Sequence, residues 1–210
     1  MKGAKSAQAC RAPPVPASWA CSREGTILLH SRRSALIVVD LQERLIPALS
    51  GGPELLGRAG ALIRAARLFE IPVTLTEEYP QGLGSTVPQI ASALPDDAAV
   101  IAKLAFGATR EDAFSVRIDA LKDAGRDQFV LAGAETHVCL LQTALGLRER
   151  GETVYLVTDA CASRRAADRE GAIERMKTCG VACVTTEMVL FEWLERKDSP
   201  AFAEILELVR

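Results

Sequence analysis

The chain contains few histidines and carries no dominant charge. Only His30 and His137 occur among its 210 residues, whereas catalytic zinc sites commonly use two or three histidine ligands. The net charge of -2 offers no basic surface of the kind that binds nucleic acid. We therefore expect chemistry without a metal or other cofactor, a small-molecule substrate, and no nucleic-acid partner.

Long apolar runs and closely paired cysteines are also missing. No apolar run approaches the roughly 20 residues that span a bilayer, which argues against a membrane partner. None of the six cysteines forms a CxxC pair, which argues against a zinc ribbon or a thioredoxin-type redox site. We expect a cytoplasmic protein with free thiols, and interpret Cys161, Cys179 and Cys183 as core thiols.

Nucleotide-binding motifs are absent as well. The first apolar run ends in DLQER, where a dinucleotide site would need glycines, and no Walker A sequence occurs. Residues 1–33 are basic and rich in proline, alanine and serine, a composition that cannot form a core. We predict an extended or disordered arm there, with a targeting leader or a misplaced start as alternatives, and one domain over residues 34–210.

Within that domain, short β-branched apolar runs alternate with longer segments of helical period. This alternation predicts an α/β fold in which helices cover both faces of a parallel sheet, so that the strands are buried on both sides. The predicted strands cover residues 35–40, 71–77, 98–103, 128–133, 153–159 and 181–187. The predicted helices cover residues 54–70, 111–125, 136–150 and 166–179.

Two segments depart from this alternation. Residues 77–89 are rich in glycine and proline, and predict a loop after the second strand. Residues 187–210 predict two amphipathic helices, the second opened by Ser199 as N-cap and Pro200 in the first turn. Their apolar faces either complete the core or contact another subunit.

Chemically useful side chains follow several predicted strands. In an open parallel sheet, ligands bind beyond the carboxyl ends of the strands. These ends carry Asp40, Glu77, Lys103, Cys139 and Asp159. Each residue alone also fits a structural role: a packed cysteine, a capping carboxylate or a surface lysine. Their common position at one edge is what favours a catalytic interpretation.

Cys139 is the candidate nucleophile of this edge. It lies in the first turn of the predicted helix after the fourth strand, where the helix dipole and a nearby lysine favour a thiolate. A carboxylate could remove the thiol proton, and backbone N–H groups could hold an oxyanion. His137 is two residues away and points elsewhere on a helix, which predicts a capping or surface role.

Three segments of the chain carry a family resemblance: ALIVVDLQERL, VIAKLAFGA and LAGAETHVCLLQTALGLRERGETVYLVTDACASR. They resemble the isochorismatase-like hydrolases, also called cysteine hydrolases. The resemblance implies a three-layer αβα fold with a six-stranded parallel sheet of order 3-2-1-4-5-6. It implies an Asp–Lys–Cys triad in which Asp40 is the base, Lys103 stabilises the thiolate and Cys139 attacks. It further implies an oxyanion hole from the backbone N–H groups of Glu135 and Cys139, and a cis peptide bond entering Glu135.

The same resemblance bears on the substrate. Nicotinamidases of the family bind a metal through an aspartate and histidines after the second strand, and TEEYPQGLGST has no histidine. Members that cleave the vinyl ether of isochorismate lack the nucleophilic cysteine, which is present here. We therefore expect cleavage of a small amide or carbamoyl C–N bond through a thioester. A vinyl ether hydrolase and a non-catalytic binding protein remain the alternatives.

The same resemblance also bears on the C-terminal segment, the oligomeric state and the pocket. The loop TEEYPQGLGSTVP and the C-terminal segment resemble isochorismatase domain-containing proteins, a branch named for its fold. A homo-oligomer, dimeric or larger, is expected from the resemblance and from the apolar C-terminal helices. The residues expected to line the substrate pocket are Gln42, Glu77, Tyr79, Phe106 and Thr136.

Overall fold

The computed structural model describes residues 28–209 and contains one six-stranded parallel sheet of order β3-β2-β1-β4-β5-β6. The predicted fold class, strand number and strand order are thereby confirmed. The strands are β1 (Ser34–Val39), β2 (Val73–Glu78), β3 (Ala99–Lys103), β4 (Gln128–Ala134), β5 (Thr153–Ala162) and β6 (Ala182–Val184).

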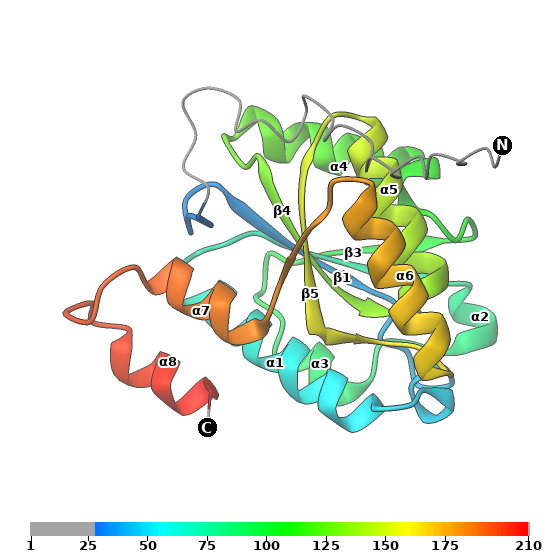
Figure 1. Ribbon diagram of the computed structural model, residues 1–210, viewed down its shortest axis with the longest axis horizontal. Helices are drawn as coiled ribbons and strands as arrows, with labels where there is room; N and C mark the ends of the chain where they lie inside the picture. The colour runs from blue at the N-terminus through cyan, green and yellow to red at the C-terminus, as the bar shows by residue number, and fades with distance from the viewer. Residues whose placement is uncertain (1–27, 210) are drawn as a thin grey trace, which may run out of the picture.

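Helices cover both faces of the sheet, which gives the three layers (Figure 1). On one face lie α1 (Gly52–Leu68), α7 (Thr186–Leu194) and α8 (Phe202–Val209); on the other lie α4 (Asp112–Asp123), α5 (Leu141–Glu149) and α6 (Ala166–Thr178). Shorter helical segments are η2 (Ile46–Ala48), α2 (Pro80–Leu83), α3 (Pro88–Ala91), η3 (Ala108–Arg110) and η4 (Thr136–Leu140).

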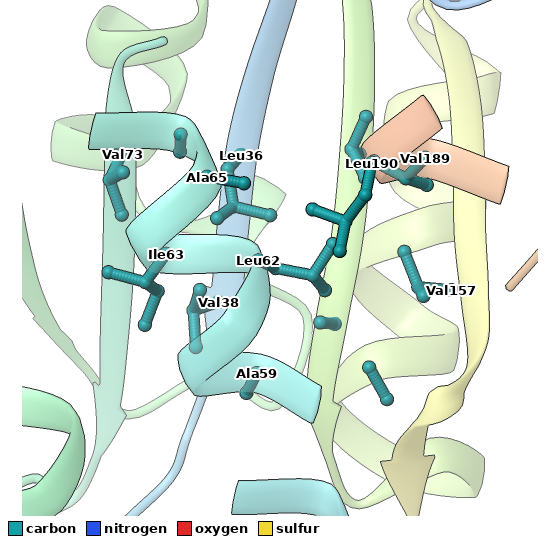
Figure 2. Close-up of a cluster of buried hydrophobic side chains, with 14 of the residues drawn as sticks. Leu36, Val38, Ala59, Leu62, Ile63, Ala65, Val73, Val157, Val189 and Leu190 are labelled. Carbon is teal, nitrogen blue, oxygen red and sulfur yellow. The ribbon is translucent and has the colours of Figure 1, made fainter. Parts of the chain in front are cut away.

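The central strand β1 divides the core in two because successive strand residues face opposite sides. Leu36 and Val38 belong to the cluster that includes residues of α1 and α7, and Figure 2 shows them beside α1, whereas Ile37 and Val39 belong to the cluster formed with α4, α5 and α6. All six residues of β1 are buried. This double coverage explains why the run ALIVV shows no polar alternation.

The edge strands depart from the prediction of burial on both faces. In β3, Val100 is 53% exposed and Ala102 is also exposed, because β3 is an edge strand and the helices pack mainly over the strands on its inner side. The opposite edge strand, β6, spans only three residues, and α7 begins at Thr186. The predicted sixth strand, residues 181–187, was therefore too long.

Other element boundaries differ from the prediction. The segment predicted as a loop, residues 77–89, includes the end of β2, the short helix α2 and the start of α3. Strand β5 runs on to Ala162, past a register shift in its pairing with β4. Cys161 is buried as predicted, but Cys179 is exposed and Cys183 half-buried, so the interpretation of all three as core thiols was wrong.

The residues just before β1 pack against the domain. Leu29 is fully buried and its N–H donates to the Glu192 carboxylate at 2.7 Å. Arg33 forms a two-point ion pair with Asp127. Residues 28–33 are therefore attached to the body of the domain, although the predicted arm included them, while residues 1–27 of that arm lie outside the described residues.

The two predicted C-terminal helices are present and pack on the α1 side of the sheet. Trp193 of α7 is buried and donates its indole N–H to Ser34 Oγ at 2.9 Å, and Ile205 of α8 is fully buried. Helix α8 begins at Phe202 rather than Pro200, and Ser199 Oγ accepts the Ala201 N–H. Between residues 28 and 209, no helix combines the length and apolarity needed to cross a membrane.

Candidate active site

A buried lysine lies between two carboxylates at the carboxyl ends of β1, β2 and β3. Lys103 Nζ is 2.7 Å from Asp40 Oδ2 and 2.7 Å from Glu78 Oε2, and the lysine side chain has no exposed surface. It also donates to the Phe106 carbonyl at 3.3 Å. Glu78 pairs in register with Lys103 across β2 and β3, which brings the two side chains together. Sequence reasoning named Asp40 and Lys103 but missed Glu78.

Asp40 is held by contacts from its neighbouring strand. Its N–H donates to the Thr76 carbonyl, and Thr76 Oγ1 donates to Asp40 Oδ1 at 2.7 Å. The residue has a φ of +50°, in the left-handed region that costs a non-glycine residue free energy. The carboxylate is completely buried. One oxygen is thus fixed by Thr76, while the other contacts Lys103.

Cys139 joins this group from the start of the helix after β4. It lies in the π-helical segment η4 (Thr136–Leu140), which precedes α5 and is one turn of a helix type that occurs frequently at functional sites. Its Sγ, one carboxylate oxygen of Asp40 and one of Glu78 all lie within 4.8 Å of one another. The cysteine is 6% exposed. Asp40, Lys103 and Cys139 are therefore brought together, as the sequence interpretation requires.

Burial and charge keep the Cys139 thiol protonated in the resting site. Burial is the largest factor that raises the pKa of Cys139, the Asp40 carboxylate raises it further, and Lys103 opposes both. The pKa of Cys139 therefore lies well above its ordinary value, and Lys103 is the neighbour that favours the thiolate, as expected from the sequence for a nearby lysine. For Lys103, burial is the largest single factor and lowers the pKa, but Asp40, Cys139 and Glu78 together raise it by more, so the net pKa is raised and the ammonium persists.

The turn between β4 and η4 has a distinct geometry. The Ala134–Glu135 peptide bond is cis, as the sequence comparison implied. The Glu135 carbonyl accepts the N–H groups of Val138 and Leu140. Its carboxylate accepts the Arg164 backbone N–H at 3.1 Å and the Arg164 Nε at 3.0 Å. Both ends of Glu135 are thus tied down, which fixes the path of the chain toward Cys139.

The two neighbouring glutamates at the end of β2 have different surroundings. Glu78 faces Lys103, whereas Glu77 Oε1 accepts the N–H and the Oγ1 hydrogen bonds of Thr86, each at 2.7 Å. Gln42 is fully buried behind Glu78: its amide group donates to the carbonyls of Glu78 and Gly84 and accepts the Glu78 N–H. Of the predicted pocket residues, Glu77 and Gln42 therefore fix the backbone around Glu78 and the loop that follows it.

Replacing Gln42 by methionine is expected to destabilise the protein by about 2 kcal/mol, because buried donors and acceptors of Glu78 and Gly84 would lose their partners. Urea unfolding measures this loss. Gln81→Met is the matched control, since Gln81 is exposed in the neighbouring helix α2. Equal stability of the two variants would contradict a bracing role for Gln42.

The other residues singled out from the sequence occupy varied positions. Tyr79 and Phe106 are 51% and 53% exposed. Both contact Lys103 through the backbone: the Tyr79 N–H donates to the Lys103 carbonyl, and the Lys103 ammonium donates to the Phe106 carbonyl. Thr136 is fully enclosed. His137 contacts Ser163 Oγ through Nδ1 at 3.0 Å, in line with the structural role predicted for it.

Asp159, the fifth candidate at a strand end, contacts Thr186 and Arg58 rather than the group around Lys103. Its carboxylate accepts the N–H and Oγ1 hydrogen bonds of Thr186 at the start of α7. It also lies 3.7 Å from Arg58 Nε. These contacts describe a capping residue, the structural alternative considered for it.

The cluster of Asp40, Glu78 and Cys139 contains atom types that can bind a metal ion. Lys103 provides a different source of positive charge, because its ammonium contacts both carboxylates at 2.7 Å. A cation placed between these carboxylates would meet that ammonium at close range. The donor set therefore fits a lysine-centred ion pair better than a metal centre.

Comparisons with known proteins identify the family of the chain and relatives of the same fold. The isochorismatase domain model matches residues 34–188. The chain is 36% identical over 214 residues to isochorismatase domain-containing protein 1 of Danio rerio, covering 100% of this chain and 71% of that protein. It is 35% identical to a solved structure described as MAR1 ribonuclease from Caenorhabditis elegans, with a TM-score of 0.80 and coverage of 87% and 92%.

Two YcaC structures are also similar. The protein from Pseudomonas aeruginosa, solved with hexane-2,5-diol and covalent acrylamide, is 28% identical with a TM-score of 0.79 and coverage of 88% and 93%. The protein from Escherichia coli, described as an octameric hydrolase of unknown specificity, is 27% identical with a TM-score of 0.79 and coverage of 88% and 92%. The matched domain spans most of the chain and includes Asp40, Lys103 and Cys139, so this protein belongs to the isochorismatase domain family.

Proposed function

We propose that the protein is a metal-independent cysteine hydrolase that cleaves a small amide or carbamoyl C–N bond. The observation that carries this proposal is the fully buried Lys103 ammonium between Asp40 and Glu78, with Cys139 Sγ within 4.8 Å of both carboxylates. Burying these charges is costly in free energy. A catalytic use explains why they surround a thiol.

The resting thiol fits a mechanism in which the base acts during attack. Asp40 takes the Sγ proton as sulfur bonds to the carbonyl carbon, and backbone N–H groups of Glu135 and Cys139 stabilise the oxyanion. The C–N bond then breaks, and the proton passes to the leaving nitrogen. Water attacks the resulting thioester, which releases the acid and restores the thiol. Lys103 holds the Asp40 carboxylate in place through their 2.7 Å contact.

The relatives support parts of this proposal. One YcaC structure holds covalent acrylamide, a small amide, and another is described as an octameric hydrolase. By analogy we propose a small-molecule substrate and a homo-oligomer for this chain. The cytoplasmic location that we also propose rests on the cysteine pattern of the sequence. The ribonuclease description belongs to the Caenorhabditis elegans protein. The net charge of -2 gives no support for transferring nucleic-acid binding.

A screen of small amides, ureides and carbamoyl compounds by ammonia release tests the proposed reaction. The purified protein should release ammonia from at least one compound, and Cys139→Ala serves as the blank. Mass spectrometry during turnover should show the acyl group attached to Cys139.

Two results would contradict the proposed reaction. The first is full activity of Cys139→Ala toward a compound that the protein turns over, and the second is turnover without an acyl adduct when the reaction is quenched rapidly. Pyruvate release from isochorismate by both proteins would favour a vinyl ether hydrolase instead. A protein that binds compounds from the screen but releases no product from any of them would favour the non-catalytic alternative.

A further inference from the structure

We propose that Glu78 determines substrate charge: it makes the site favour neutral or cationic carbonyl compounds that carry an N–H group, and disfavour compounds that carry a carboxylate there. This inference rests on the proposed function, because it assumes that the ligand lies at Cys139. It assigns to the second carboxylate of the site a role that the Asp–Lys–Cys triad leaves unexplained.

The charges of the site do not cancel. Lys103 contributes one positive charge to a contact with two carboxylates, Asp40 and Glu78. The cation on the adjoining turn, Arg164, is already paired with Glu135. With a neutral Cys139 thiol, the group of four side chains therefore carries one excess negative charge. In a buried site that charge acts strongly on a ligand, because little water screens it.

Of the two carboxylates, Glu78 is the one that a ligand in the site can contact. The side chains of Asp40 and Lys103 are 0% exposed, whereas that of Glu78 is 10% exposed. A carboxylate oxygen of Glu78 also lies within 4.8 Å of Cys139 Sγ. Because this distance is short, a substituent of a carbonyl compound bound at the sulfur can contact the Glu78 carboxylate. An N–H there can donate a charge-assisted hydrogen bond, whereas a carboxylate would be repelled.

Two alkylating reagents of nearly the same shape test this inference. Iodoacetamide is neutral and carries N–H donors, whereas iodoacetate carries a carboxylate in the same place. With both reagents the thiolate sulfur bonds to the methylene carbon and iodide leaves. The ratio of the two rates at one cysteine is therefore independent of how much thiolate is present. That ratio reports on reagent recognition alone.

Peptide mass spectrometry after timed labelling gives this ratio for each cysteine. In the wild type we expect the preference for iodoacetamide over iodoacetate to be about tenfold greater at Cys139 than at exposed Cys179, because Glu78 repels the anion. Glu78→Gln should remove most of that difference. Glu77→Gln should change the Cys139 ratio by less than about twofold, because Thr86 holds that carboxylate in the adjoining loop.

The possible failures are distinguishable. If Cys139 reacts with neither reagent even at alkaline pH, where more thiolate is present, while Cys179 reacts with both, the proposed nucleophile fails. If Cys139 reacts but Glu78→Gln changes both of its rates by one common factor, Glu78 only positions Lys103 and the charge-selection proposal is overturned. Labelling of buried Cys161 shows that a variant has lost its fold.

A wild-type measurement covers the case in which the Glu78 variant does not fold. Aminoethyl methanethiosulfonate is cationic and sulfonatoethyl methanethiosulfonate is anionic, and both form a disulfide with a thiolate while a sulfinate leaves. Relative to Cys179, Cys139 should favour the cationic reagent by about tenfold or more. Equal preference at the two cysteines would overturn the proposal without any substitution.

Discussion

Asp40→Asn is expected to slow hydrolysis of an identified substrate by about a thousandfold, the scale of a lost general base, while it speeds alkylation of Cys139. Asparagine keeps the shape and still accepts the Thr76 hydroxyl hydrogen bond. It cannot take the thiol proton. The two effects have opposite signs because the base and the source of negative charge beside the thiol are the same group.

The alkylation effect follows from the causes of the raised Cys139 pKa. Burial is the largest of these, and the negative charge of Asp40 is the next. Removing that charge lowers the pKa, so that more thiolate is present at any pH below the midpoint. The pH profile of iodoacetamide labelling at Cys139 should therefore move to lower pH in Asp40→Asn.

Asp127→Asn is the matched control, because Asp127 pairs with Arg33 in a half-exposed position before β4. It should alter neither the hydrolysis rate nor the labelling profile of Cys139. Parallel loss of hydrolysis and labelling in Asp40→Asn would mean that Asp40 acts only by maintaining the local structure. Unchanged hydrolysis would remove it from the mechanism.

The parity of the second strand explains which glutamate the sequence interpretation missed. The predicted strand ended at Glu77, whereas β2 continues to Glu78, which pairs in register with Lys103. Because side chains alternate along a strand, a shift of one residue moves the site from one glutamate to the next. Strand ends are predicted least accurately, so the sequence could indicate a carboxylate here without selecting between the two.

The parts of the fold that sequence predicted well are those with strong hydrophobic patterns. Strand β1 is apolar throughout because helices cover both its faces, and that pattern is visible in the sequence. Exposure of Val100 on β3 follows from strand order, which local composition does not contain. The raised pKa of Cys139 likewise depends on burial and on Asp40, a residue 99 positions earlier in the chain.

Gly133→Ala is expected to be the most destabilising small substitution near the site. Gly133 has a φ of +127°, a conformation that alanine adopts only with strain. An added Cβ would lie 2.1 Å from the Val39 carbonyl oxygen and 2.6 Å from the Val39 nitrogen. Since both contacts are with the backbone of the adjacent strand, no side-chain rotation relieves them. Strain and overpacking together predict a loss of about 3 to 5 kcal/mol.

The same displacement should reach the chemistry. Val39 ends β1 directly before Asp40, and Gly133 precedes the Ala134–Glu135 turn that leads to Cys139. Pushing the two strands apart would therefore separate the proposed base from the proposed nucleophile, and any folded Gly133→Ala protein should lose most of its hydrolytic activity. Gly171→Ala is the control: Gly171 lies inside α6 with nothing within 4 Å of an added Cβ, so that variant should gain about 0.5 to 1 kcal/mol. Urea unfolding that gave both variants wild-type stability would contradict the close approach of β1 and β4 at Gly133.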